Sequence, residues 1–448
     1  AITACLSLVV LVAGKMRNDN NAPGELHFHW FAPFLSGGGY CSEAAGFAEA
    51  LAERVPRLKI SQHGDTPNEA FIKGMPKKLL KRLERLRDTK VDPDRLVAVC
   101  HAEPGAWNVG DGAKYQTTPC PPLEEPLYTI GRTMFETNRI PLDWADRCNA
   151  MDEVWVPTEF HRGTFEAAGV MPNKLSVVPE PVDVVRFDPN RKGLARAPDL
   201  HAVTWLKGRV LGGGAAGYAS AAAAPPGTVE QVRFLSIFKW EARKGWDILL
   251  EAFATEFSAV DRVSLTLITN PFHSNEDLVA EVERFVAKHA AAAGQRTLPE
   301  IIVVDSHIPE SKMPQLYRSH DCFVLPSRGE GWGRPHVEAM SMGLPVIATN
   351  WSGPTAYLTE HNSYPLSIDN LVTVSTGAFR KYHKWAQPSL SQLRSLMRHV
   401  VDNPEDARLK GRNAREDMVT KFSPDKVADV VIARLWQIHD KLVENGEL

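Results

Sequence analysis

The chain has few cysteines, little net charge and no apolar run long enough to cross a bilayer. Its 448 residues include six cysteines, with no CxxC pair and no zinc-like spacing to histidine. We therefore expect buried thiols rather than a zinc site or a disulfide framework. A formal net charge of −3 argues against nucleic acid as the main partner.

The apolar stretch at the start, AITACLSLVVLVAG (1–14), is followed by Lys15 and Arg17 and fits two interpretations. It is too short to span a membrane. It can be the remnant of a signal anchor or of a signal peptide. It can equally be an apolar tail or an additional strand, and residues 1–24 are assigned as an N-terminal tail that leaves both open.

Strand-like and helix-like segments alternate through the rest of the chain. This alternation predicts α/β domains with parallel sheets, and the length allows about two to three domains. Residues 184–231 interrupt the pattern with a low-complexity stretch rich in alanine and glycine, which we expect to be a mobile surface insertion. The expected division is a Rossmann-like domain at 25–183, linker and insertion at 184–231, a second α/β domain at 232–422 and a helix at 423–448.

The sequence of the last predicted helix indicates both where the helix begins and which of its faces is apolar. Ser423 is expected as its N-cap and Pro424 as its first residue. One apolar face follows at helical spacing, formed by Val427, Val431, Leu435, Ile438 and Leu442. The helix should therefore pack along its length against another part of the molecule.

Residues 328–351, RGEGWGRPHVEAMSMGLPVIATNW, place Glu330 and Glu338 around a glycine-rich turn. The apolar run before the turn is typical of a buried strand, Pro335 suits the first turn of a helix, and LPVIAT predicts the next strand. In such a βαβ unit the loop lies at the carboxyl edge of the sheet, where ligands bind. Free N–H groups at the helix start attract phosphate, whereas the two carboxylates suit hydroxyls of a ribose or a sugar.

A second candidate phosphate site lies in FKWEARKGWD (238–247). Lys239 and Lys244 follow a predicted buried strand and precede the next helix. Two ammonium groups at this sheet edge could hold a diphosphate and neutralise it as it leaves. Lysine pairs on loops are usually just solvated, so the glycine loop in the same domain is what favours the functional interpretation.

Two features of the first domain are candidate ligand contacts. SGGGY (36–40) offers backbone N–H groups at Gly37, Gly38 and Gly39, and it imitates part of a dinucleotide fingerprint, although Asp65 lies too far on to bind a ribose. His101 closes a buried strand at the edge where a cleft would lie, so a catalytic role is as plausible as a structural one. Asp92-Pro93-Asp94 resembles a metal-binding DxD motif only superficially, because it lies before a predicted strand and its residues are typical of a turn.

The segment KGMPKKLLKRLERLRDTK (73–90) predicts a basic helix. Its leucines cluster into a small apolar seam, so a solvated basic face over that seam is the favoured interpretation. The functional alternative is docking on an anionic membrane surface.

Together these residues resemble the retaining nucleotide-sugar glycosyltransferases of the GT-B fold, glycosyltransferase family 4. In that family two glutamates separated by seven residues mark the donor site, as Glu330 and Glu338 are here. VPTEFHRGTFEAAGVMPNKLSVVPEPVDVVRFDP (156–189), FKWEARKG (238–245) and MPQLYRSHDCFVLPSRGEGWG (313–333) are similar to further family segments. Lys239 departs from the pattern, because arginine is commoner there. The resemblance runs from about residue 26 to the C-terminus, with 190–231 unmatched.

The resemblance implies a GT-B fold, in which two Rossmann-like domains face each other across a cleft and the C-terminal helix returns to the first domain. In the donor site, Glu338 would accept hydrogen bonds from the ribose, and Glu330 would hold hydroxyls of the donor sugar. The backbone of Gly331, Trp332 and Gly333 would bind phosphate.

The remaining roles complete the implied reaction. His101 would lie near the transferred sugar, and SGGGY would close over the diphosphate. Lys239 and Lys244 would neutralise the charge of the diphosphate, as a metal ion does in other enzymes, so neither a metal nor another cofactor is expected. The activity implied is that of a hexosyltransferase that retains the anomeric configuration, with acceptor contacts expected from RTMFETNRIP (132–141) and the loop 102–126.

Rival functions remain open at this stage. One is an NAD-dependent oxidoreductase, resting on the incomplete fingerprint at 37–42, and another is a non-catalytic nucleotide-sugar-binding protein or a nucleotide-sugar epimerase of the same fold. The expected partners are a nucleotide-sugar donor and a glycan, lipid or small-molecule acceptor, with an anionic membrane surface as a further candidate and no nucleic acid. Localisation stays open between the cytoplasm, the cytosolic face of a membrane and an endomembrane lumen.

Overall fold

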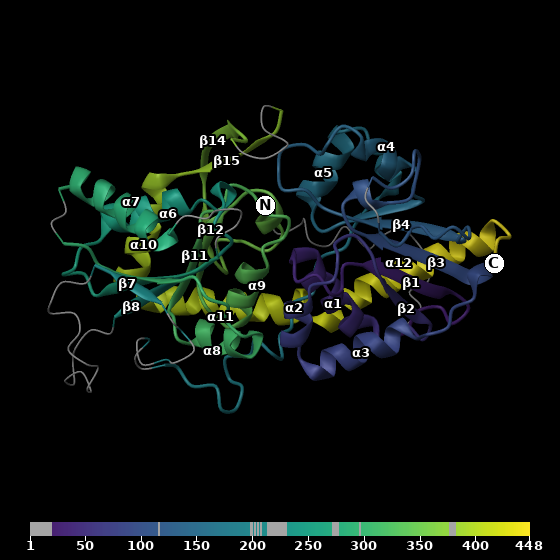
Figure 1. Cartoon of the computed structure of the whole chain (residues 1–448), viewed down its shortest axis with the longest axis horizontal. Helices are drawn as coiled ribbons and strands as arrows, with labels where there is room; N and C mark the ends of the chain where they lie inside the picture. The colour runs from purple at the N-terminus through teal and green to yellow at the C-terminus, as the bar shows by residue number, and fades with distance from the viewer. Residues whose placement is uncertain are drawn as a thin grey trace.

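The structure is a computed structural model that describes residues 20–448 except 115–116, 198–199, 201–202, 204–205, 207, 213–230, 271–276, 295–296 and 376–381. The apolar stretch 1–14 and the glycine- and alanine-rich centre of the insertion therefore lie outside the described residues. Two separate sheets, one parallel and one mainly parallel, form the two halves of the molecule, as Figure 1 shows.

The first sheet has six parallel strands in the order β2-β1-β3-β4-β5-β6. Its central strand β3 is buried at every position, which explains its continuous apolar run. The strands are β1 His27–Ala32, β2 Leu58–Gln62, β3 Leu96–His101, β4 Tyr128–Arg132, β5 Glu153–Val156 and β6 Leu175–Val177. The helices of this half are α1 Gly39–Leu51, α2 Glu69–Gly74, α3 Lys77–Arg87, α4 Trp144–Asn149 and α5 Glu159–Ala167. The hydroxyl of Thr158 accepts a hydrogen bond from the His161 N–H and so caps α5.

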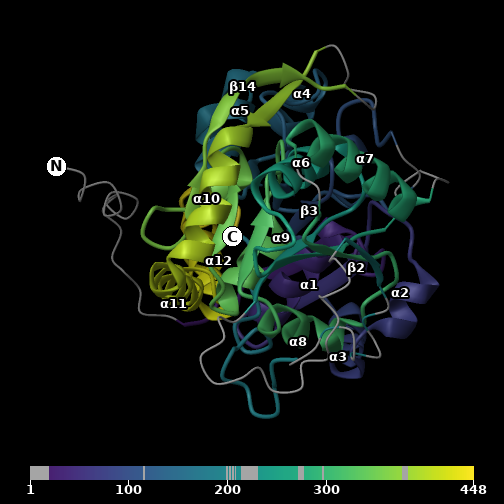
Figure 2. The same cartoon turned by 90° about the vertical axis from the view of Figure 1, so that its left-hand side faces the viewer.

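The second sheet has seven strands in the order β13-β12-β11-β8-β9-β10-β7. Its strands are β7 Arg209–Leu211, β8 Val232–Ile237, β9 Val263–Ile268, β10 Glu300–Val304, β11 Cys322–Leu325, β12 Val346–Thr349 and β13 Tyr364–Leu366. A separate hairpin pairs β14 Ile368–Thr373 with β15 Lys384–Pro388. The helices are α6 Trp246–Glu256, α7 Leu278–Ala292, α8 Met313–Arg318, α9 Arg334–Ser341, α10 Leu390–Asp402 and α11 Pro404–Lys421. In Figure 2, α10 leads into α11, and α11 packs against α9.

The segment 184–231 differs from the expected surface insertion in its described parts. β7 pairs antiparallel with β10 and forms the edge of the second sheet. Ala197, Leu200 and Leu206 are buried in the core of that domain. The composition of the segment did not indicate this packing, because only a few apolar residues are needed to cover the edge of a sheet.

The helix α12, Pro424–Glu444, returns from the second half to the first, as the yellow ribbon in Figure 1 shows. It begins at Pro424 after Ser423, and its five predicted face residues are all buried in the core of the first domain. Arg434 also donates hydrogen bonds to the buried carboxylate of Glu153 at 2.6 and 2.9 Å. No helix in the described ranges combines the length and the apolar character that a membrane span needs.

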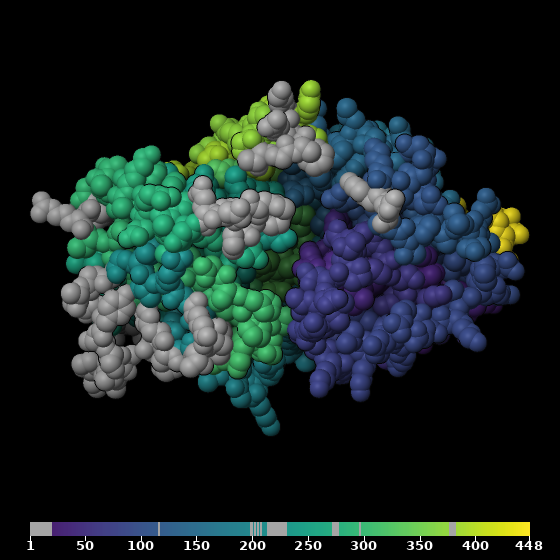
Figure 3. Space-filling model, viewed as in Figure 1, coloured from purple at the N-terminus to yellow at the C-terminus, as the bar shows by residue number. Residues whose placement is uncertain are grey.

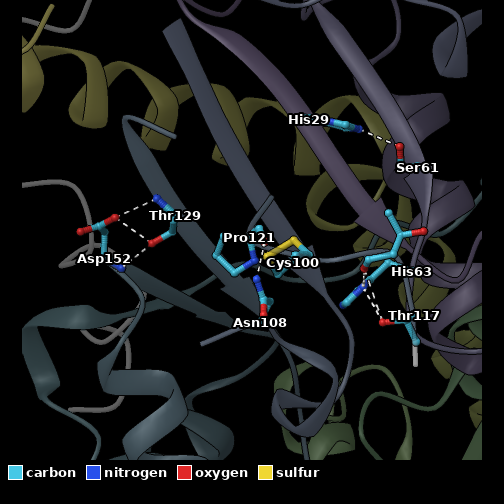
Figure 4. The surroundings of a disulfide bond; sticks show 11 residues. His29, Ser61, His63, Cys100, Asn108, Thr117, Pro121, Thr129 and Asp152 are labelled. Carbon is cyan, nitrogen blue, oxygen red and sulfur yellow. Dashed lines mark hydrogen bonds between the residues drawn. A yellow bond between two sulfur atoms is a disulfide. The ribbon is translucent and has the colours of Figure 1, made fainter. Parts of the chain in front are cut away.

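The expectation for cysteine was wrong at one pair. Cys100, near the end of β3, is bonded to Cys120 in the following loop, and Figure 4 shows the surroundings of this disulfide. The bond ties the loop 102–126 to the sheet beside His63, which contacts the carbonyl oxygen of Thr118 at 2.7 Å. Sequence spacing did not reveal the pair because the two residues meet only through the path of the loop. Cys41, Cys148 and Cys322 are buried thiols, as expected.

Candidate functional site

A cavity of about 730 Å³ lies between the two sheets, where the surface is hollowed between the two halves of the molecule in Figure 3. Its walls come mainly from segments that follow the carboxyl ends of strands, which is the edge where open α/β sheets bind ligands. The first half contributes side chains after β1, β3 and β4, and the second half contributes side chains after β8, β9, β10 and β11.

The glycine-rich turn after β11 has the predicted strand, loop, helix and strand arrangement. Gly331, Trp332, Gly333 and the start of α9 all line the cavity. Gly333 has a φ of 103°, a conformation that L side chains rarely adopt. A Cβ at Gly331 would collide with Met134 of the first half. The glycines therefore let this turn lie directly against the other domain.

Glu330 lies at the centre of a buried charge cluster. Its two carboxylate oxygens accept hydrogen bonds from the Lys244 ammonium, each at 2.8 Å, and one also accepts from Arg243 at 3.2 Å. Burial acts to raise the pKa of Glu330, but Lys244 and Arg243 outweigh it and lower that pKa to about 2. The side chain is 6 % exposed and is held charged inside the cavity wall.

Arg243 was missed by the sequence analysis. Its guanidinium reaches Glu330, Glu241 at 2.8 Å and, across the cavity, Glu136 of the first domain at 3.1 Å. It lies within FKWEARKG, but its place between two lysines gave no reason to single it out. A sequence cannot show which of three neighbouring cations turns toward a carboxylate far away in the chain.

The two predicted lysines both line the cavity. Lys244 is turned inward onto Glu330, and burial followed by the charge of Arg243 lowers its pKa. Lys239 is exposed at the rim. The structure thus brings Lys239, Lys244 and Glu330 together with the turn at 331–333, as the βαβ pattern indicated.

Glu338 lies one turn into α9 but is not one of the residues that line the cavity. Its carboxylate accepts a hydrogen bond from the Tyr317 hydroxyl at 2.9 Å. Burial raises the pKa of Glu338, while Arg334 and the Tyr317 hydrogen bond oppose that shift. Glu338 is thus half-buried beside the cavity, on the same short helix as the cavity-lining Arg334.

His101 is buried behind the cavity-lining Tyr40, with 5.5 Å between the two ring centroids, and its catalytic role stays a prediction. It ends β3, but its side chain is 0 % exposed and does not line the cavity. One ring nitrogen contacts Glu43 at 3.0 Å, and the other accepts from the Trp30 indole at 3.2 Å. Glu43 also pairs with Arg132 at 2.6 Å. The sequence placed His101 at the right edge of the sheet but could not show that its imidazole points into the core.

The glycine loop of the first domain, SGGGY (36–40), reaches the cavity through Gly39 and Tyr40. α1 begins at Gly39, which lines the cavity, and Gly38 precedes it as the N-cap. Gly37 and Gly38 are not among the lining residues. Gly37 has a φ of 83°, so it supports the turn into the helix. The loop therefore presents the start of a helix to the cavity.

Both segments proposed for acceptor contacts line the cavity. Met134, Phe135 and Glu136 come from the segment 132–141, and Glu103 comes from the loop 102–126. Partial burial, followed by the charges of Glu136 and Asp65, raises the pKa of Glu103. Every charged side chain that the part before β7 gives to the cavity is a glutamate, since the remaining one is Glu180.

Comparison with known proteins supports this fold assignment. Residues 230–375 match the family model described as glycosyl transferases group 1. The chain is similar to mannosylfructose-phosphate synthase of Agrobacterium fabrum, at 24 % identity over 27 % of this chain and 25 % of that protein. It is also similar to an MMP alpha-(1->4)-mannosyltransferase of Mycolicibacterium hassiacum, at 26 % identity over 42 % of this chain and 39 % of that protein. The matched regions thus span a quarter to two fifths of these relatives.

Solved structures match over nearly the whole chain. Anabaena HepE in complex with UDP has a TM-score of 0.61 at 13 % identity, covering 92 % of this chain and 100 % of that one. WaaG, a glycosyltransferase involved in lipopolysaccharide biosynthesis, has a TM-score of 0.52 at 15 % identity, covering 90 % and 99 %. These likenesses support the predicted fold of two Rossmann-like domains. Residues 230–375 therefore form a domain of the glycosyl transferases group 1 type, within a chain that has the GT-B fold.

Proposed function

We propose that this protein is a glycosyltransferase that moves a hexose from a nucleotide-diphosphate sugar to an acceptor hydroxyl with retention of anomeric configuration. The observation that carries the proposal is the buried Glu330, held charged by Lys244 and Arg243 beside the start of α9 in the cavity between the sheets. This arrangement offers a carboxylate to sugar hydroxyls, with cations and free N–H groups for phosphates.

The donor fits the wall that the second domain provides. Lys239 and Lys244 supply positive charge for a diphosphate, together with the N–H groups at 331–333 and the start of α1 at Gly39. Glu338 would take the ribose hydroxyls, with Tyr317 orienting its carboxylate until the nucleotide binds. The named relatives include mannosyltransferases and a structural neighbour is bound to UDP, which favours a UDP- or GDP-linked hexose.

The acceptor fits the wall that the first domain provides. Glu103 and Glu136 can accept hydrogen bonds from hydroxyls of a glycan, a glycolipid or a small molecule. In the transfer, the bond between the anomeric carbon and the diphosphate oxygen breaks while the acceptor oxygen attacks that carbon from the same face. The acceptor proton passes to an oxygen of the departing phosphate. Lys239 and Lys244 neutralise the charge that develops, so the proposed reaction needs no metal ion.

The test is binding and turnover with UDP-glucose, UDP-N-acetylglucosamine, UDP-galactose and GDP-mannose. We expect calorimetry to give micromolar affinity for one nucleotide class, and slow hydrolysis of its sugar to release a product whose anomeric configuration, read by NMR, equals that of the donor. An inverted product would contradict retention. Absence of binding to all four donors would contradict the function itself.

The same experiment separates the rival functions. Nicotinamide fluorescence transfer with NADH should be absent, because Gly37 and Gly38 of the dinucleotide-like loop do not line the cavity. Binding of a donor without hydrolysis or transfer would support the non-catalytic nucleotide-sugar-binding protein.

A further inference from the structure

Glu180 is a buried carboxyl group in the cavity wall that the proposed reaction does not yet use. It lies in PEPVD, in the stretch that leads from β6 to the second domain, between Pro179 and Pro181. Proline fixes its own φ and restricts the residue before it to extended conformations, so the backbone at Glu180 has little freedom. The side chain lines the cavity although it is only 2 % exposed.

Arginines from both domains hold this segment in place. Arg132 of the first domain donates a hydrogen bond to the carbonyl oxygen of Val178 at 2.5 Å. Arg334, at the start of α9, donates to the carbonyl oxygen of Pro181 at 2.6 Å. The position of Glu180 is therefore fixed relative to the turn at 331–333.

The carboxyl group itself makes only a distant contact. The guanidinium of Arg334 lies 3.8 Å from it, which is longer than a hydrogen bond, and no hydrogen bond to it is found within the described residues. Burial, with the nearby charge of Glu43, raises the pKa of Glu180 well above its usual value, against the opposing effect of Arg334 and Arg132. A protonated carboxyl group both donates and accepts a hydrogen bond, as a sugar hydroxyl does.

Glu180 and Glu330 flank the same turn. Burial first, and then the charges of these two carboxyl groups, raise the pKa of Tyr357, whose hydroxyl donates to the Trp332 carbonyl oxygen at 2.6 Å. Three hydrogen bonds from Lys244 and Arg243 already use most of the accepting capacity of Glu330, whereas Glu180 has more hydrogen-bonding capacity left for a ligand. The cations that suit a diphosphate lie elsewhere, at Lys239 and Lys244.

We propose that Glu180 hydrogen-bonds a hydroxyl group of the transferred sugar. This inference rests on the proposed function, because it requires a nucleotide-sugar donor in the cavity. Glu180 would contact the sugar part of the donor and neither its nucleoside nor its diphosphate. Its loss should therefore weaken binding of the whole donor without weakening binding of the nucleoside diphosphate.

The experiment compares Glu180→Gln with Glu180→Met by calorimetry against UDP, UDP-glucose, GDP and GDP-mannose. Both replacements keep the length of the side chain, but only glutamine can hydrogen-bond. We expect Glu180→Met to weaken the bound nucleotide sugar about tenfold and its nucleoside diphosphate less than twofold, and Glu180→Gln to stay within about threefold for both. Glu283→Met, an exposed position on α7, is the matched control and should bind as the unmodified protein does.

The outcomes separate the two proposals. Equal weakening of nucleotide sugar and nucleoside diphosphate by Glu180→Met would overturn the assignment, as would unchanged binding of both. Because a buried position is altered, thermal unfolding of each variant is measured in parallel. If Glu180→Met does not fold, a loss of the sugar-dependent affinity in a folded Glu180→Asp variant supports the assignment, and its retention overturns it. An unmodified protein that binds none of the four ligands would overturn the proposed function, and this inference with it.

Discussion

At the scale of single residues, the charge of Glu330 depends on two neighbouring cations. A buried carboxylate without a partner would become protonated, because removing its charge from water costs more than binding a proton. Lys244 and Arg243 reverse that balance here and keep the carboxylate charged. Glu330 and Lys244 were identified from the sequence. Arg243 was identified only in the structure, where it forms ion pairs with both Glu330 and Glu136.

The role of Lys244 leads to a kinetic prediction. We expect Lys244→Ala to lower kcat about 100-fold and to change KM for the donor less than threefold, because charge accumulates on the diphosphate only as the bond breaks. Steady-state rates with the donor identified by calorimetry measure both constants. Lys288→Ala, an exposed lysine on α7, should leave both unchanged. A rise in KM at constant kcat would mean that Lys244 binds ground state and transition state equally.

At the scale of elements, α3 shows why a basic helix is hard to interpret from sequence. Its leucines were expected to form an apolar seam, and the structure packs Leu79, Leu80, Leu83 and Leu86 against the core of the first domain. Arg82 and Arg85 pair with Glu53, and Arg87 pairs with Asp88. The helix thus presents charge rather than apolar side chains to its surroundings, and contact with a membrane would have to be electrostatic.

The membrane hypothesis can be tested with a chain that begins at residue 20. If α3 docks on lipid, flotation with vesicles containing phosphatidylserine should occur at low salt and disappear in about 0.5 M salt, because exposed charges are screened within about 3–8 Å there. Reversing Lys77, Lys78 and Lys81 to glutamate should abolish it, since each basic residue adds about 1 kcal/mol near an anionic surface. Neutral phosphatidylcholine vesicles are the control. If the chain ignores anionic vesicles at low salt, α3 is only a solvated face.

At the scale of the whole molecule, α12 and the cavity contacts join the two halves. The helix leaves the second half and buries its apolar face in the core of the first. Across the cavity, the Arg243–Glu136 ion pair and the close approach of Gly331 to Met134 are further contacts between the halves. Both α12 and the contacts across the cavity therefore fix how the two walls lie relative to each other. Any transfer reaction depends on that placement.

The attachment of α12 can be tested at Arg434. We expect Arg434→Ala to lower the free energy of unfolding of the first domain by about 2 kcal/mol, because Glu153 is 1 % exposed and would lose its charged partner. The value is at the low side of the usual range because Arg434 is about one third exposed. Urea unfolding followed by tryptophan fluorescence measures the change. Lys426→Ala on the same helix should cost less than about 0.5 kcal/mol, and a similar loss in both variants would contradict the role of the ion pair.

The sequence by itself determined the features that depend on local patterns. Continuous apolar runs separated by helices specify parallel strands, and glycine at a helix start specifies the turn at 331–333, because such preferences act over a few neighbouring residues. The face of α12 and the cap at Thr158 follow for the same reason. The shared position of Lys239, Lys244 and Glu330 in one cavity wall could be predicted because they flank these local signals.

Only the tertiary structure decided which way side chains point and which distant residues meet. His101 and Lys244 both follow buried strands, yet one turns into the core toward Glu43 and the other into the cavity toward Glu330. The Cys100–Cys120 bond, the strand β7 and the reach of Arg243 to Glu136 likewise join segments that local patterns treat separately. Their arrangement depends on the packing of whole elements, because burial and charge pairing are settled by neighbours that are distant in the chain.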